Sequence, residues 1–131
     1  MEFSRATKDS AGYDFRAPED YELKPGEWVT IDTGIRFDDS TRTTILSRWV
    51  MFILPRSGLA RDYGFKLATT VSVIDMDYRD NITITISVDK PYKLMKGERF
   101  AQGIIVPFGT FVGEVEPDTI RQGGHGSTGR I

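Results

Sequence analysis

Residues 82–88 read Ile82-Thr-Ile-Thr-Ile-Ser-Val88, and their alternation points to the fold class. An isoleucine or valine stands at every second position, with threonine or serine between them. A period of two places the aliphatic side chains on one face of an extended strand and the hydroxyl side chains on the other. The stretch therefore predicts a strand that lines the core of a β-protein.

Further apolar runs surround this stretch, and glycine or proline separates them. Short apolar runs that are separated by glycine or proline are typical of a sandwich or barrel of short strands. One segment predicts a helix of about two turns, with Ser57 as its N-cap and Gly64 just beyond its end. The other expected strands cover residues 27–37 with a turn at Thr33-Gly34, residues 43–54 as one strand or two, residues 99–106 and residues 110–115.

The composition of the chain narrows the classes of function. Its 131 residues suit one domain, and its formal net charge of -2 argues against a protein that grips a nucleic-acid backbone. It has no cysteine and a single histidine, which excludes disulfides, thiolate metal sites and two-histidine sites. The first ten residues lack the apolar run of a signal peptide, and no stretch approaches a membrane span. We expect a cytoplasmic protein that binds neither nucleic acid nor membrane.

The last eleven residues, Arg-Gln-Gly-Gly-His-Gly-Ser-Thr-Gly-Arg-Ile, differ in character from the rest of the chain. They are rich in glycine and nearly lack apolar side chains, so they cannot bury enough surface to order by themselves. We therefore expect a β-barrel domain over residues 1–120 and a flexible C-terminal arm over residues 121–131. Such a segment either stays a linker or orders on a ligand, because its N–H groups and hydroxyls suit a phosphate.

Two other segments carry chemistry but leave alternatives open. Arg56-Ser57-Gly58 stands at the start of the expected helix. The segment either only caps the helix, with the arginine on the surface, or forms a phosphate-binding site. Asp75 and Asp77 would share one face of a strand, where they form either an acidic turn or a pair for metal binding or general-base catalysis.

Taken in order, five segments resemble the signature of the trimeric dUTPase family. Any one of these motifs is weak evidence, whereas five in register over residues 10–129 form a specific pattern. They are Ala11-Gly-Tyr-Asp14, Pro55-Arg-Ser-Gly-Leu-Ala60, Val73-Ile-Asp-Met-Asp-Tyr-Arg79, Gly97-Glu-Arg-Phe-Ala-Gln102 and Gly126-Ser-Thr-Gly129.

The resemblance implies an all-β, dUTPase-like barrel or jelly roll with one short helix, assembled as a homotrimer with shared active sites. It implies hydrolysis of dUTP to dUMP and pyrophosphate with Mg²⁺, which keeps uracil out of DNA. Asp75 would be the general base, and Tyr78 would pack under the deoxyribose. Asp14 would hold waters of the Mg²⁺ ion without ligating it. The other implied substrate contacts are Arg56, Ser57, Gly58, Thr69, Ser72, Gln102, Arg121, His125, Gly126, Ser127 and Thr128.

Some positions depart from the family pattern. Thr69 stands where relatives carry an asparagine that helps to read uracil, Ser72 replaces a glycine, and Asp80 replaces a frequent glycine. In the arm, His125 replaces a phenylalanine that stacks on uracil. The arm is one residue shorter than usual, so either Arg121 or Arg130 would meet the outer phosphates.

Two other functions remain open for this fold. A related dCTP deaminase would need a glutamate beside the base, and Val-Ile-Asp-Met-Asp-Tyr-Arg-Asp-Asn-Ile-Thr-Ile-Thr-Ile over residues 73–86 has none. A nucleotide-gated regulator would keep the dUTP site and act by binding another protein. The compact chain suits a phage or viral origin, which makes that second role plausible.

Overall fold

The strand predicted over residues 82–88 is β7 (Thr83–Ser87), the middle strand of a three-stranded sheet. The computed structural model, which describes residues 3–121, pairs it antiparallel with β3 (Val29–Asp32) and β5 (Lys66–Leu67). The aliphatic residues at positions 82, 84, 86 and 88 are at most 1% exposed. The alternation therefore identified both the strand and its buried face.

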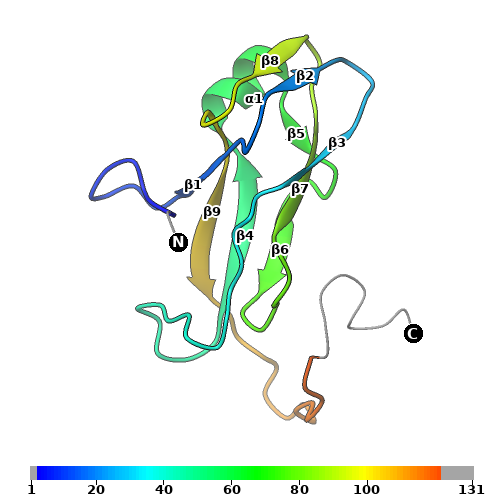
Figure 1. Ribbon diagram of the computed structural model, residues 1–131. Helices are drawn as coiled ribbons and strands as arrows, with labels where there is room; N and C mark the ends of the chain where they lie inside the picture. Colours follow the sequence, from blue (N-terminus) through cyan, green and yellow to red (C-terminus); the bar gives the residue numbers. More distant parts are fainter. Residues whose placement is uncertain (1–2, 122–131) are drawn as a thin grey trace.

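The largest sheet has four strands in the order β1-β9-β4-β6, each antiparallel to its neighbours (Figure 1). Its two central strands pair over the whole length of β4, so this pair forms the most continuous part of the fold. The strands are β1 (Tyr13–Arg16), β9 (Arg99–Pro107), β4 (Trp49–Pro55) and β6 (Ser72–Asp75).

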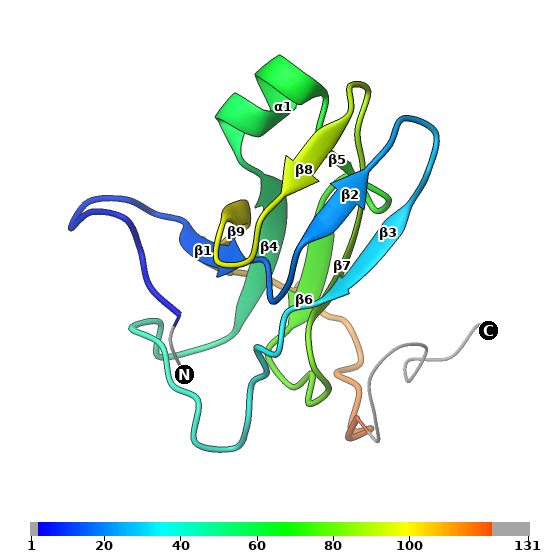
Figure 2. The ribbon, with the colours of Figure 1, turned by 45° about the horizontal axis from the view of Figure 1, so that its top comes forward.

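A third sheet pairs β2 (Tyr21–Leu23) with β8 (Tyr92–Leu94), and helix α1 (Ser57–Tyr63) connects β4 to β5. Figure 2 shows the two smaller sheets on one side of the molecule and β1, β9 and β4 on the other. Phe15, Met51 and Phe100 of the large sheet pack in one cluster with Ile84 and Leu94 of the smaller sheets. The predicted all-β architecture of short strands with one short helix is thus confirmed. Within residues 3–121 no helix is long and apolar enough to cross a bilayer.

Two predicted strand segments were wrong in part, and a third was wrong entirely. Over residues 27–37 only β3 forms, because the Thr33 hydroxyl donates to Ile82 O at 2.7 Å and Gly34 then takes φ +70°. Over residues 43–54 the strand begins only at Trp49, since the Thr43 hydroxyl accepts the N–H of Ile45 in a local turn. Residues 110–115 form no strand, because the chain turns at Gly113.

The helix has the predicted bounds but a different N-terminal cap. Arg56 is the N-cap, with extended backbone and no side-chain capping hydrogen bond, and Ser57 is the first helical residue. Gly64 ends the helix in the left-handed conformation, with its N–H directed to Ala60 O, as predicted. The helix therefore starts directly after β4, which places Arg56 at one end of the large sheet.

Candidate active site

One cluster of predicted site residues gathers where β6 ends. Asp75 is the last residue of β6, and Arg121 donates from Nη2 to its Oδ2 atom. The same guanidinium donates from Nε to Asp77 Oδ1 at 2.8 Å. Its Cζ atom lies 5.9 Å from the ring centroid of Tyr78. The structure thus brings together three residues of the third motif and the first residue of the arm, with one cation bridging two carboxylates.

Tyr78 forms the apolar wall of this cluster. Its side chain is buried, with 7% of the residue exposed, and its hydroxyl donates to Asn81 O at 3.4 Å. Burial raises the pKa of Tyr78 above its ordinary value, and the charge of Asp80 acts in the same direction. The phenol therefore stays neutral near pH 7 and offers a ring face rather than a proton donor or acceptor of catalysis.

Asp75 combines exposure with a fixed position. Its side chain is 51% exposed, although Arg121 covers one oxygen. The β-ladder holds its Cα opposite Val50 of β4. A carboxylate that is anchored by a strand and open to solvent can accept a proton from a bound water.

A second cluster forms around Gln102 on β9. Its Nε2 atom donates to Pro55 O at 3.2 Å, and its backbone pairs with Asp14 of β1. Asp14, whose side chain is 10% exposed, lies 3.6 Å from Arg99. Pro55 directly precedes Arg56 and Ser57, so the first, second and fourth motifs meet at this end of the sheet.

The two clusters lie at opposite ends of β4. Asp75 is opposite Val50, whereas Gln102 is opposite Leu54, four residues further along the same strand. At roughly 3.3 Å per residue this separates the clusters by about 13 Å along the strand, with a further two strand spacings of about 5 Å each across the sheet. Within one chain, the Asp75 carboxylate and the Gln102 amide therefore cannot act on the same phosphate.

Thr69 lies in the connection between β5 and β6, beside Ser72, the first residue of β6. Their hydroxyl oxygens are 2.6 Å apart, so one donates to the other. Thr70 between them has φ +66°, a strained conformation for a β-branched residue. The two residues that replace the family's asparagine and glycine thus close a tight turn just before β6.

The predicted arm residues fall mostly beyond this description. His125, Gly126, Ser127, Thr128 and the alternative Arg130 lie outside the described residues 3–121. Arg121 is the one arm residue whose contacts are seen, and they are with carboxylates of its own chain.

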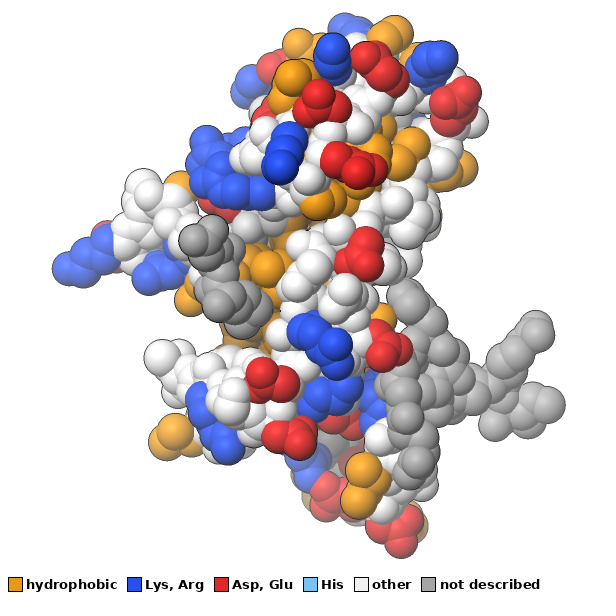
Figure 3. All heavy atoms as spheres, in the orientation of Figure 1, with side chains coloured by type: hydrophobic (Ala, Val, Ile, Leu, Met, Phe, Trp, Pro, Cys, Tyr) orange, Lys and Arg blue, Asp and Glu red, His pale blue; other side chains and the backbone are white. Residues whose placement is uncertain are grey.

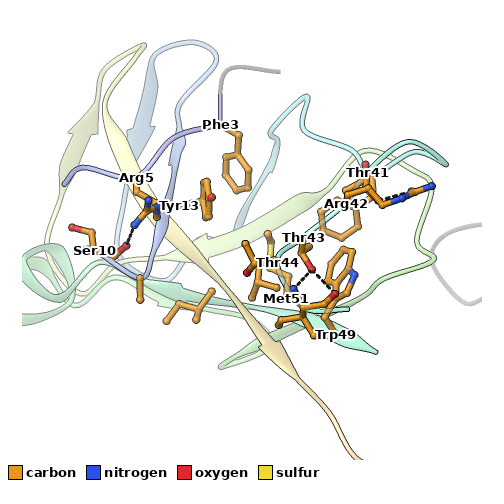
Figure 4. A pocket seen from close by; sticks show the side chains of 15 residues that line it. Phe3, Arg5, Ser10, Tyr13, Thr41, Arg42, Thr43, Thr44, Trp49 and Met51 are labelled. Carbon is orange, nitrogen blue, oxygen red and sulfur yellow. Dashed lines mark hydrogen bonds between the residues drawn. The ribbon is translucent and has the colours of Figure 1, made fainter. Parts of the chain in front are cut away.

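A groove that Asp75 does not line has a volume of about 730 Å³. It runs between the N-terminal segment, the loop before β4 and the large sheet. Figure 4 shows the rings of Phe3 and Tyr13 on one side and Trp49 with Met51 on the other. Ser10 and Ala11 of the first motif also line it, so the groove borders one cluster without containing it.

Charged side chains of both signs are mixed over the face seen in Figure 3, with hydrophobic side chains uncovered between them. This face shows no broad basic patch of the kind that holds a nucleic-acid backbone.

Two contacts between charged side chains of the site were not predicted from the sequence. Asp77 holds Arg121 beside Asp75, and Arg99 lies against Asp14. The motifs contain both residues, but spacing along the chain does not show which charges meet across a sheet.

Comparison with known proteins gives a consistent result. The family model described as dUTPase matches residues 2–129. The deoxyuridine 5'-triphosphate nucleotidohydrolase of Nautilia profundicola is 38% identical over 130 residues, which cover 95% of this chain and 87% of that protein. The crystal structure of dUTPase from Streptococcus mutans has a TM-score of 0.68 at 29% identity and covers 85% of this chain and 88% of that one. The dUTPase of phage phi11 of S. aureus, described with a structural Mg(II) ion, shares the fold with a TM-score of 0.69 at 23% identity, covering 90% of this chain and 91% of that one.

Proposed function

The chain belongs to the dUTPase family, and we propose that it hydrolyses dUTP to dUMP and pyrophosphate with Asp75 as the general base. The observation that carries the residue assignment is the cluster at the end of β6. There a solvent-accessible carboxylate and a buried aromatic face of the third motif meet the cation at the start of the arm. We place the reaction in the cytoplasm, or in that of a host cell for a viral protein.

The reaction needs one proton acceptor and a well-positioned phosphate chain. A water oxygen attacks the α-phosphorus, and its proton passes to a carboxylate oxygen of Asp75. The bond from the α-phosphorus to the bridging oxygen breaks, and pyrophosphate leaves with the electron pair. Because phosphoryl transfer depends mainly on positioning and charge neutralisation, the protein needs no covalent nucleophile.

The other residues would bind and orient the nucleotide. Arg56, Ser57 and Gln102 would contact the phosphate chain, because all three lie near the other end of the large sheet. Tyr78 offers its buried ring to the deoxyribose, where a 2′-hydroxyl would collide with it. The turn that contains Thr69 and Ser72 would present its backbone and hydroxyl groups to the uracil edge.

Mg²⁺ fits this donor set as an ion carried by the triphosphate. Within residues 3–121, no group of three or more acidic or histidine side chains converges to hold a metal ion. Asp14 is a single carboxylate beside Arg99, which suits a group that orients metal-bound water. The bound ion would neutralise charge on the phosphates.

A shared site in a homotrimer resolves the separation of the two clusters. Asp75 of one chain and Gln102 of another can face the same nucleotide, although the two residues of one chain cannot. Such a contact joins different surfaces of identical chains. A heterologous contact of this kind closes into a ring when its rotation permits.

Residues 111–120 form an apolar segment that supplies a further reason for association. The segment extends away from the barrel (Figures 1 and 2). The side chains of Phe111, Val112, Val115 and Ile120 are 77–105% exposed. Together with the apolar groove beside β1, this segment is surface that a second copy of the chain would bury at a gain of about 25 cal/mol per Å².

Pyrophosphate release tests the proposed function directly. The chain is incubated with Mg²⁺ and each of dUTP, dCTP, dTTP, dATP, dGTP and UTP. We expect pyrophosphate release from dUTP alone, or much faster release from dUTP than from the other nucleotides. Ammonia release from dCTP would identify a deaminase, and tight dUTP binding without pyrophosphate would identify a binding protein.

A further inference from the structure

The side chain of Gln102 lies directly over Gly12. A Cβ atom built on Gly12 would be 2.4 Å from Gln102 Oε1 and 3.1 Å from Gln102 Cβ. Gly12 is one residue before β1, and Asp14 pairs with Gln102, so the two residues are neighbours across the β1–β9 ladder. The amide of Gln102 thus occupies the space that any other residue at position 12 would fill.

This placement fixes the other end of the same amide. Gln102 Nε2 donates to Pro55 O, the carbonyl that directly precedes Arg56. An amide that rests on Gly12 and is bonded to Pro55 has little freedom to rotate. Gln102 is therefore held at a set position beside the start of the Arg56-Ser57-Gly58 segment.

We propose that Gly12 is a positioning residue, whose missing side chain lets the Gln102 amide lie where it meets the phosphate chain of the nucleotide. The proposal rests on the function proposed above and assigns a task to the glycine of the first motif. Gly12 acts only through Gln102 and does not itself touch the substrate.

The alternative, that Gly12 serves the stability of the fold, fits the geometry less well. Gly12 is not among the residues with positive φ, so its backbone accepts an alanine. The atom nearest to the added Cβ, Gln102 Oε1, is the far end of a flexible side chain, which can swing away. The contact with Gln102 Cβ at 3.1 Å needs only a small shift. At Gly103 the corresponding neighbours are Met51 Sδ at 2.8 Å and Phe15 Cε2 at 3.1 Å, both in the core. A methyl group at position 103 would strain packing, whereas one at position 12 would move an amide.

Steady-state kinetics of Gly12→Ala give the first test, with Gly109→Ala as the matched control. Position 109 has open space and an ordinary φ, and it lies outside both clusters. We expect Gly12→Ala to lower kcat/KM for dUTP about 10- to 100-fold, mainly through kcat, because a misplaced contact spoils alignment. Its urea midpoint should equal that of Gly109→Ala. Wild-type kcat/KM in Gly12→Ala would overturn the proposal.

A double-mutant cycle separates positioning from an independent effect. Gln102→Ala removes Oε1 and Cδ, which lie 2.4 Å and 3.3 Å from the added Cβ, and keeps only the Cβ atom of residue 102 at 3.1 Å. In that background, Gly12→Ala should change kcat/KM by less than about twofold, because residues that act through one contact are not additive. An equal loss in both backgrounds would show that Gly12 acts without Gln102.

The NMR signals of side-chain amides provide a readout that does not need turnover. The chain has two glutamines and one asparagine, so three pairs of NH₂ signals cover all of them. The Gln102 pair should shift in Gly12→Ala and stay in place in Gly109→Ala. An unmoved Gln102 signal refutes the proposal even in an active enzyme. A wild-type chain that does not hydrolyse dUTP refutes the proposed function, whatever the amide does.

Discussion

The guanidinium of Arg121 lies against the carboxylate of Asp75 in the same chain, although 46 residues separate them. A second hydrogen bond to Asp77 makes Arg121 a bridge between two carboxylates. The cation at the start of the arm thus forms an ion pair with the residue proposed as the general base. A triphosphate offers the same cation a stronger negative charge, so substrate binding and release of Asp75 would be linked.

Asp75→Asn tests the base. The amide keeps the shape of the carboxylate but accepts no proton, so kcat should fall about 10²–10⁴-fold. Binding of dUTP should not weaken, because the change removes a negative charge near the phosphates. Stopped assays and isothermal titration measure the two effects. Glu22→Gln, at an exposed pair with Lys93 on the β2–β8 sheet, serves as the control. A kcat above about a tenth of wild type would assign the base to another group.

Mixed trimers test the shared site. Asp75→Asn and Gln102→Ala chains should each be nearly inactive, and mixing them should restore activity after chain exchange. Random assortment in closed trimers leaves about a quarter of the sites with an intact Asp75 from one chain and an intact Gln102 from another. Two differently tagged Asp75→Asn chains provide the control. Verified exchange without recovery would refute a site shared between Asp75 of one chain and Gln102 of another.

Tyr78 should discriminate between deoxyribose and ribose. Tyr78→Ala should lower the ratio of dUTP to UTP efficiency, because it removes the ring that excludes a 2′-hydroxyl. The loss of a buried ring should also destabilise the fold by about 3 kcal/mol. A ratio of kcat/KM values is unaffected by the folded fraction. Tyr78→Phe keeps the ring and should keep the ratio. If Tyr78→Ala also keeps the wild-type ratio of dUTP to UTP efficiency, Tyr78 is a core residue that does not select the sugar.

Thr69 and Ser72 should leave the preference for uracil in place. Their hydroxyls are bonded to each other, and the turn they close fixes the backbone groups that can read a pyrimidine edge. We expect at least tenfold higher kcat/KM for dUTP than for dCTP. The Thr69→Val variant should retain most of this preference. Equal use of the two nucleotides by the wild-type chain would show that the replaced asparagine matters more than the turn.

Alkaline pH should destabilise the fold through Tyr92. Burial, followed by a hydrogen bond to Glu98, raises the pKa of Tyr92 from 10.0 to about 12. The folded state therefore keeps the phenol proton that the unfolded state loses. The stabilisation is complete below pH 10 and disappears as pH rises to 12. Urea unfolding between pH 9 and 11.5 should show a steeper loss for wild type than for Tyr92→Phe. If the stability of wild type and of Tyr92→Phe falls equally with pH, Tyr92 does not cause the alkaline destabilisation.

Local patterns predicted a large part of the fold. The period-two stretch identified β7 and its buried face, and glycine and proline marked the ends of strands and helix. The errors arose where a side chain competed with the ladder, as at Thr33 and Thr43, or where an apolar run turned at Gly113. The N-cap was misplaced by one residue because backbone geometry, not the hydroxyl of Ser57, sets the start of the helix.

The sequence by itself determined the chemistry available to this protein: the five motifs, the single histidine, the absence of cysteine and the family to which the chain belongs. Only the tertiary structure decided which of those groups meet. Strand register places Asp75 and Gln102 at opposite ends of β4 and sets Gly12 beneath Gln102. The path of the chain after β9 brings Arg121 to Asp75. The reason is physical: a side-chain pattern reports the face of its own strand, whereas the pairing of distant strands depends on packing throughout the sheet.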